Sequence, residues 1–478
     1  MVKHVRWSYV SFSHLTQNEG ILSHLFFLIP LINAQNRVIT LKEAITSTLS
    51  DFGGVKAKKN QLIYYKNLFK AEKSGELPDF SISAQQDYGT INGQSGPSYA
   101  YRGLNVSSSG PVLTNQNYHA AFGSLYLANV NWDIFSFGKV KNLVSVAEKR
   151  TNQANADLNQ EEFQDEVKVS ANYLNLLASI QLEKAQYSNL QRALSIQHVV
   201  KSRVLAGLNA GVDSSLASAD VSAARIALTN IRETENEQQA ELANLLGNSA
   251  TNFTLDTSFV QHIPGEIDTT QINSINSHPF LAYFAQAISI NEALVKYLRS
   301  LQYPTFSIFS VFQGKGSGFS QSYGSQNQRA YSQNYSQGIK PTISNYLIGA
   351  GMIWNFSSLV KTGHLIDAQR IQGEVLKNNY QQVENQLDNQ VILSGKRVKN
   401  ALNNFNEAPV ELRAATEAYR QKNVLYSNGL ATIVDLSTAL YTLNRAETDQ
   451  QIAYNNIWQA LLFRAAARGD FQAFYKLL

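Results

Sequence analysis

Side chains that perform covalent or metal chemistry are few in this 478-residue chain, and their spacing matches no catalytic motif. There is no cysteine, which excludes a thiol nucleophile, a disulfide framework and a thiolate zinc site. The eight histidines are scattered and lack the H-E-x-x-H pairing of a zinc protease. Gly314-Lys315-Gly316 lacks the spacing of a phosphate-binding loop, and no serine lies in a nucleophile elbow. The sequence therefore argues against an enzyme and predicts neither a cofactor nor a bound metal.

Glycine, leucine and aspartate instead occur twice in the same order. Gly207-Leu208 precedes Asp213, and Gly429-Leu430 precedes Asp435. A glycine in the left-handed conformation ends a helix, and an aspartate accepts the free amide hydrogens that begin the next one. Capping therefore explains the glycines and the aspartates, but it does not explain an apolar leucine at each turn. Exposed leucines at two turns predict a docking surface for another protein.

The two turns belong to a longer internal repeat. Trp132-Asp133-Ile134-Phe135 resembles Trp354-Asn355-Phe356, and 354 − 132, 429 − 207 and 435 − 213 are each 222. Loops tolerate insertions far better than helices do, so a fixed spacing predicts helix between these landmarks. The chain is accordingly divided into two repeats, residues 35–256 and 257–478.

Long helices must connect the strand ends to the turns. Between Asp133 and Val204 there is no proline and only one glycine, which predicts a helix of ~70 residues and ~105 Å. The chain then returns as a helix from Ser214 to about Leu246. The second half repeats this pattern, except that Pro409 should kink its long helix.

The apolar positions of the first long helix form two stripes, one through Val167 and Leu174 and one through Val169 and Tyr173. A helix with two apolar stripes has two neighbours, as in a closed ring of helices, whereas a two-stranded coiled coil needs only one. The remaining polar face suits a water-filled interior and bulk water equally well.

Each half also contains strand-like segments with one apolar face, near residues 80–85, 120–135 and 345–356. Strict alternation of this kind predicts strands. Two strands per half are too few for a soluble sandwich, but 12–16 residues exceed the 9–11 that a tilted membrane strand requires. No segment after the N-terminus approaches 18 continuous apolar residues, so strands of a closed barrel would have to cross any membrane. Trp132 and Trp354 lie at strand ends, where an aromatic girdle contacts the membrane interface.

The N-terminus and the composition indicate an exported protein. Residues 1–34 combine Lys3 and Arg6 with a short apolar run and a small residue at Ala34, as in a cleaved signal peptide. A buried N-terminal helix is the alternative. The net charge of +4 gives no reason to expect nucleic-acid binding, and the mean hydropathy of −0.23 is too polar for a helical membrane bundle.

A strand pair, a helix of ~100 Å, a Gly-Leu…Asp turn and a returning helix, all duplicated, resemble the TolC family of outer-membrane efflux channels. The resemblance covers residues 38–470. It rests on Trp132-Asp133-Ile134-Phe135-Ser136-Phe137-Gly138, on Arg203-x-x-x-Gly207-Leu208 with Asp213-Ser214-Ser215-Leu216, and on Gly429-Leu430 with Val434-Asp435-Leu436.

The resemblance implies a mostly α protein with membrane β-structure. Three copies would form a homotrimer in the outer membrane of a Gram-negative bacterium, with a shared 12-stranded β-barrel continued by a long periplasmic α-helical barrel. It also implies that the turns contact a periplasmic adaptor protein through Arg203, Gly207, Leu208, Gly429 and Leu430. Leu425 replaces the arginine in the second half, so the second turn should bind differently.

The resemblance further places a tunnel-entrance gate near Glu417 and Arg420, where family members carry acidic rings. The arginine departs from an all-acidic ring, and the alternative is that both residues are solvated surface charges. The implied function is a passive exit duct, engaged by an adaptor and an inner-membrane pump of a tripartite efflux or type I secretion system. The alternative is an exported coiled-coil structural protein without a pore, although its exposed apolar strands would aggregate.

Overall fold

The computed structural model describes residues 38–93, 110–247, 254–257 and 275–478. The predicted signal peptide, residues 1–34, lies outside the described residues. The body of the protein begins at Val38.

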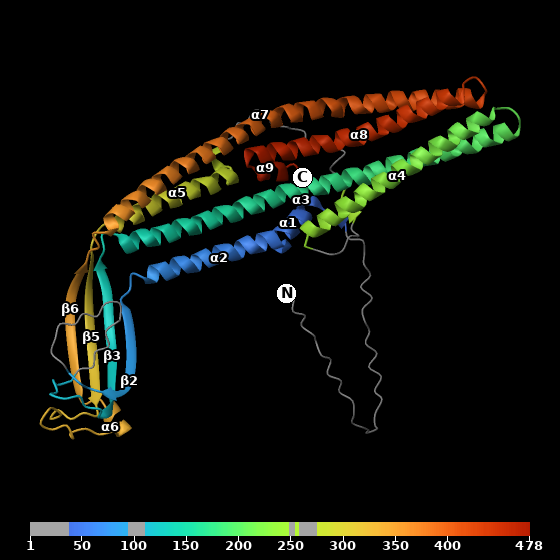
Figure 1. Ribbon diagram of the computed structural model, residues 1–478. Helices are drawn as coiled ribbons and strands as arrows, with labels where there is room; N and C mark the ends of the chain where they lie inside the picture. The colour runs from blue at the N-terminus through green and yellow to red at the C-terminus, as the bar shows by residue number, and fades with distance from the viewer. Residues whose placement is uncertain (1–37, 94–109, 248–253, 258–274) are drawn as a thin grey trace, which may run out of the picture. The chain divides into compact units, whose positions relative to one another are not determined.

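Helices dominate this body (Figure 1). The helices are α1 (Leu41–Asp51), α2 (Gly53–Ser74), α3 (Lys139–Leu205), α4 (Gly211–Leu245), η1 (Ile275–Ser277), α5 (Pro279–Ser300), α6 (Tyr335–Ile339), α7 (Ser358–Ser427), α8 (Ile433–Arg468) and α9 (Phe471–Tyr475). The strands are β1 (Val38–Ile39), β2 (Asp79–Thr90), β3 (Ala120–Phe135), β4 (Thr254–Leu255), β5 (Thr305–Ser317) and β6 (Ile343–Ile353). A helix, two strands, a long helix and a returning helix thus follow one another twice, first as α2-β2-β3-α3-α4 and then as α5-β5-β6-α7-α8.

The four long strands form one antiparallel sheet in the order β2-β3-β5-β6, while β1 and β4 pair separately and in parallel. The register places apolar residues opposite one another on one face, for example Ile82 opposite Ala128 and Phe312 opposite Tyr346. The other face is largely polar near the helices, where the Ser81 hydroxyl donates to the Asn129 side chain. The predicted alternation is therefore present, and it gives the sheet one continuous apolar surface.

The two long helices have 67 and 70 residues, close to the predicted length. Helix α3 begins only at Lys139 because β3 continues to Phe135, and Phe137 and Gly138 then turn the chain with positive φ. Helix α7 continues through Pro409, which has no amide hydrogen to donate to the Phe405 carbonyl. Figure 1 shows α7 curving along its length.

Each long helix has neighbours on two sides, as its two apolar stripes predict. Helix α3 packs against α2 and α5 toward the sheet and against α4 and α8 toward the turns, while α7 packs against α5 and α8. The largest core lies midway along α3, where the fully buried Tyr173, Leu174, Ile457 and Trp458 meet α1, α8 and α9. Within the described ranges, no helix is both long enough and apolar enough to span a membrane.

Candidate functional site: two helical turns and the helices behind them

The turns that end α3 and α7 have the same backbone geometry. Gly207 and Gly429 adopt φ of +74° and +75°. The Leu208 amide donates to the Arg203 carbonyl and the Leu430 amide to the Leu425 carbonyl, both at 2.9 Å. This hydrogen bond closes a helix whose next residue is left-handed, a conformation that glycine adopts without steric cost. The structure thus confirms the capping role predicted for both glycines.

Both turns present a leucine to solvent. The Leu208 side chain is 71% exposed and the Leu430 side chain 75% exposed. Behind them the four helices share a buried cluster, which includes Val200 of α3, Val221 of α4, Tyr426 of α7 and Leu436 of α8. The leucines are therefore held at the end of a packed four-helix unit, at the far end of the long helices from the sheet (Figure 1).

Arg203 joins one turn to the other. Its Nη1 donates to the carbonyls of Tyr426 (3.0 Å) and Ser427 (3.3 Å), and its Nε donates to the Asn209 side chain (3.1 Å). The guanidinium also lies over the Tyr426 ring, 5.3 Å from its centre. The last carbonyls of a helix lack backbone partners and carry partial negative charge, so a cation there stabilises the helix end. Arg203 of α3 therefore caps α7 within one protomer.

The two aspartates of the turns differ. Asp435 belongs to a capping box with Thr432, in which each residue bonds the other's backbone amide (3.1 and 3.2 Å). The amide and hydroxyl of Thr432, with help from Lys422, hold the pKa of Asp435 below its usual value. The capping prediction is wrong for Asp213, because Ala210 precedes α4 without any side-chain cap. The Asp213 carboxylate instead accepts a hydrogen bond from the Asn209 amide at 2.7 Å.

Glu417 and Arg420 form an ion pair with each other on the exposed surface of α7. Nε and Nη2 of Arg420 donate to the two oxygens of Glu417 at 3.0 and 2.8 Å. These hydrogen bonds, followed by one from Gln421, lower the pKa of Glu417 to about 2. The pair lies about two turns of helix before Leu425. Its role as a tunnel gate stays a prediction.

Trp132 and Trp354 occupy matching places where the sheet meets the helices. Each ring nitrogen donates to a backbone carbonyl at 3.1 Å, that of Glu76 for Trp132 and that of Gln302 for Trp354. Both acceptors lie two residues before a proline that precedes a strand. Both rings remain about half exposed, and their contact with lipid stays a prediction.

Sequence analysis missed the polar contacts that join the two halves near the turns. Arg192 of α3 forms a two-pronged ion pair with Glu447 of α8, at 3.1 and 2.5 Å, and Ser437 of α8 donates to Asp220 of α4 at 2.6 Å. The partners of each pair are more than 200 residues apart, and no motif marks them. The repeat makes α4 and α8 equivalent, but it does not show that they are neighbours.

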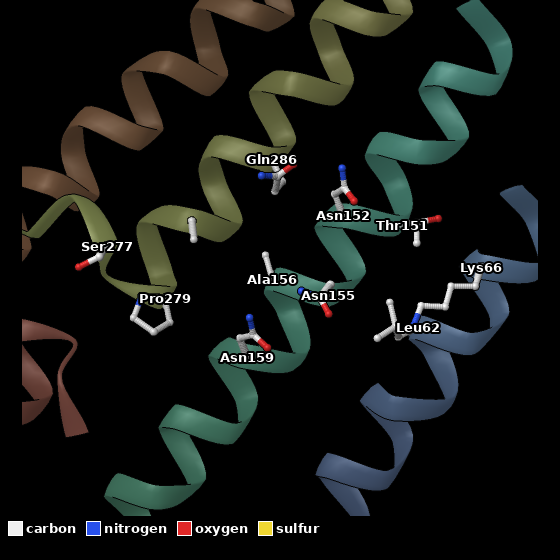
Figure 2. Close-up of a pocket in the computed structure, with 11 residues that line it drawn as sticks. Leu62, Lys66, Thr151, Asn152, Asn155, Ala156, Asn159, Ser277, Pro279 and Gln286 are labelled. Atoms are coloured by element: carbon white, nitrogen blue, oxygen red, sulfur yellow. The ribbon is translucent and has the colours of Figure 1, made fainter. Parts of the chain in front are cut away.

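Figure 2 shows a groove nearer the sheet, formed by α2, α3 and α5. Its volume is about 520 Å3, and amide side chains of Asn152, Asn155 and Asn159 on α3 and of Gln286 on α5 line it. Across the described residues, no three histidine, aspartate or glutamate side chains gather closely enough to hold a metal ion.

Comparison with known proteins gives a family match for part of the chain and a fold for most of it. The family model described as outer membrane efflux protein matches residues 70–248. The CmeC outer membrane channel of Campylobacter jejuni has a TM-score of 0.76 at 13% identity, with 90% of this chain and 85% of that chain covered. The outer-membrane channel OprN has a TM-score of 0.71 at 15% identity, with coverages of 90% and 89%. The outer membrane protein VceC of Vibrio cholerae has a TM-score of 0.69 at 15% identity, with 90% of this chain and 96% of that chain covered. No curated protein matches the sequence.

The fold and the matched segment together define an outer-membrane channel of the efflux class. Residues 70–248 match the outer membrane efflux protein family, and the chain has the fold of the TolC-family channels that its duplicated strand, helix and turn pattern resembles. Its place is the outer membrane of a Gram-negative cell, with the helices on the periplasmic side. This family consists of channels and not of enzymes.

Proposed function

We propose that this protein is the exit duct of a tripartite efflux pump or a type I secretion system. It would form a passive, water-filled conduit from periplasm to exterior, while an inner-membrane pump supplies energy and selects the cargo. The observation that carries the proposal is the pair of matching turns, each with an exposed leucine and tied together by Arg203. Two alike apolar tips suit an adaptor protein that presents the same hairpin surface to both.

The sheet supports assembly as a homotrimer in outer-membrane lipid. Its outer strands, β2 and β6, each have one edge without a partner strand in the described chain. Four strands cannot close, because a barrel of about eight is already only wide enough for its own side chains. Three copies would supply 12 strands with the apolar face outward, and would bring Trp132 and Trp354 to the membrane interface. The repeats 35–256 and 257–478 would each contribute two of the four strands.

Opening the periplasmic end would require the turns to separate. The bonds from Arg203 to Tyr426 and Ser427 and the ion pair of Arg192 with Glu447 hold them together within a protomer. Glu417 and Arg420 would lie near the constriction. An adaptor that binds the separated turns more tightly than the joined ones would shift the channel toward the open form.

An export assay combined with adaptor cross-linking tests this function. Leu208→Asp places a charge on one docking tip, and Gly429→Pro forces a φ near −65° where the turn needs +75°. Both variants should abolish export and adaptor cross-linking while trimer assembly stays intact. The control is Gly211→Pro, at the first position of α4, where proline is tolerated and where no atom lies within 4 Å of an added Cβ. Unchanged export in both tip variants would overturn adaptor docking at the turns.

A further inference from the structure

A second cavity lies midway along the long helices, between α3, α5, α7 and α8. Its volume is about 450 Å3, within the range of roughly 300–1,000 Å3 that small-molecule sites occupy. We call it the wall pocket. Four phenylalanines converge on it from three helices: Phe163 of α3, Phe280 and Phe284 of α5, and Phe463 of α8. No residue of the two turns or of the ion pair at Glu417 contributes to this cavity.

Among the described residues that line the wall pocket no charge is unpaired, and the Arg397 guanidinium, which is outside the lining, lies over the Phe463 ring, 4.3 Å from its centre. His278 is buried, its Nε2–H donates to the Ala466 carbonyl (3.1 Å), and its Nδ1 accepts from the Phe280 amide (3.2 Å). This pattern requires a neutral imidazole, and burial lowers the pKa of His278 in agreement with it. The one charged side chain among the described lining residues is Lys168, which is paired at 3.1 Å with the buried carboxylate of Asp165.

Amides supply the polar rim of the pocket. Gln164, Gln386 and Gln390 line it, and none of the three side chains hydrogen-bonds to another group in the described part of the chain. An amide can both donate and accept. Aromatic walls, a lining without unpaired charge and free amides at the rim together fit a neutral, planar aromatic molecule with a hydrogen-bonding edge.

Two of the α8 residues that line the pocket lie on the side of that helix away from α9. Trp458 of α8 packs edge-on against Phe474 of α9, with ring centres 6.3 Å apart. Phe463 and Ala467 follow Trp458 by five and nine residues, about 1.4 and 2.5 turns, so they lie on the opposite side of α8. In the proposed ring of helices, a position of α9, β1 and β4 on the outer side would leave the wall pocket facing the tunnel.

We propose that the wall pocket is a binding site for neutral planar aromatic molecules that pass through the tunnel, an inference that rests on the proposed function for its cargo role. Such a molecule would place its rings among Phe163, Phe284 and Phe463 and its polar edge toward the glutamine amides. The site favours uncharged cargo, because the charge of Lys168 is already compensated by Asp165.

Equilibrium dialysis of coumarin, a neutral bicyclic aromatic lactone, against the full-length protein in lipid nanodiscs tests the site. Empty nanodiscs give the background of partitioning into lipid. Val383→Trp fills the pocket from α7 and should weaken binding at least tenfold. Val375→Trp, two turns earlier on α7 at an exposed position outside the pocket, should bind as the wild type does. Phe284→Ala removes one aromatic wall and should weaken binding several-fold.

Two results would overturn the wall pocket: wild-type binding no greater than that of empty nanodiscs, or unchanged binding by Val383→Trp that elutes at the wild-type size. The duct and the pocket can fail separately. If the protein exports cargo but does not bind coumarin, the proposed pocket is wrong and the proposed duct stands. If the protein exports nothing, but binds coumarin and loses that binding in Val383→Trp, the pocket stands and the duct is wrong.

Discussion

At the scale of single residues, the tip depends on Arg203 more than on either aspartate. A charged donor that meets two free carbonyls and an aromatic face contributes more than a neutral cap, because hydrogen bonds to charged groups are worth about 1.5–3 kcal/mol. Its counterpart in the second half, Leu425, cannot do the same for α3. The hydrogen bonds between the turns therefore run in one direction, from Arg203 of α3 to the carbonyls at the end of α7.

Replacing Arg203 with alanine should loosen the end of α7. A loss of about 1–2 kcal/mol corresponds to a roughly 5–30-fold larger equilibrium constant for opening of the last turn. Hydrogen–deuterium exchange at the Gly429 and Leu430 amides measures this, and the tip should exchange faster while the midpoint of α7 does not change. Arg225→Ala, an exposed arginine on α4, is the matched control. Equal exchange in both variants would show that Arg203 does not hold the turns together.

Glu166 on α3 should make stability depend on pH near neutrality. Burial, reinforced by the nearby Glu162, raises its pKa from 4.5 to about 7. Because the folded pKa is the higher one, the folded state binds the extra proton, and stability falls as pH rises from 4.5 to 7. Glu166→Gln should therefore raise the Tm by a few degrees at pH 8 and leave it unchanged at pH 4. Glu148→Gln, an exposed carboxylate on the same helix, should change neither value. An equal gain at both pH values would contradict the assignment.

At the scale of elements, local sequence patterns predicted the helices and strands, which depend on interactions between residues close together in the chain. The absence of proline and glycine between residues 139 and 204 predicted α3, and alternation predicted β3, because both patterns act within a few residues. The order β2-β3-β5-β6 and the contact of Arg203 with Tyr426 join segments far apart in sequence, so no local pattern contains them. Asp213 was mispredicted because its carboxylate accepts a hydrogen bond from the Asn209 side chain, and because Ala210 has no hydroxyl with which to form a capping box.

Two neighbouring residues of β6 should distinguish the lipid face of the sheet from the tunnel face. Ile348 is 70% exposed on the apolar face, and Leu347 is 59% exposed on the opposite face. Lysine on a lipid-facing strand costs about 2–4 kcal/mol at mid-membrane, whereas a lumen position faces water. Ile348→Lys should therefore reduce the amount of protein in the outer membrane severalfold, and Leu347→Lys should leave it near wild type. Immunoblots of fractionated membranes measure the amount of each variant. The reverse ranking would mean that the face with Leu347 contacts lipid and the face with Ile348 lines the tunnel.

At the scale of the whole molecule, the strand edges and the exposed apolar surfaces both indicate that several copies of the chain assemble. The sheet has an apolar face and two edges that have no partner strand among the described residues of one protomer. The helices that continue it also expose apolar side chains such as Val360 and Ile371 of α7. An exposed edge beside apolar surface leads to aggregation unless another strand pairs with it. Closure by identical copies satisfies the strand edges and covers the helix surfaces in one step, whereas a single chain satisfies neither.

The particle extracted from the outer membrane should accordingly contain three chains. Light scattering of the detergent-solubilised protein, corrected for bound detergent, should give three times the mass of the mature chain, because three four-stranded sheets supply the 12 strands proposed for the barrel. Leu208→Asp should give the same mass, since its side chain lies at the exposed tip and not at a strand edge. A soluble monomer or dimer in the periplasmic fraction would mean that the strands do not lie in lipid. The protein would then be an exported coiled-coil protein without a pore, and the apolar face of its sheet would need another partner.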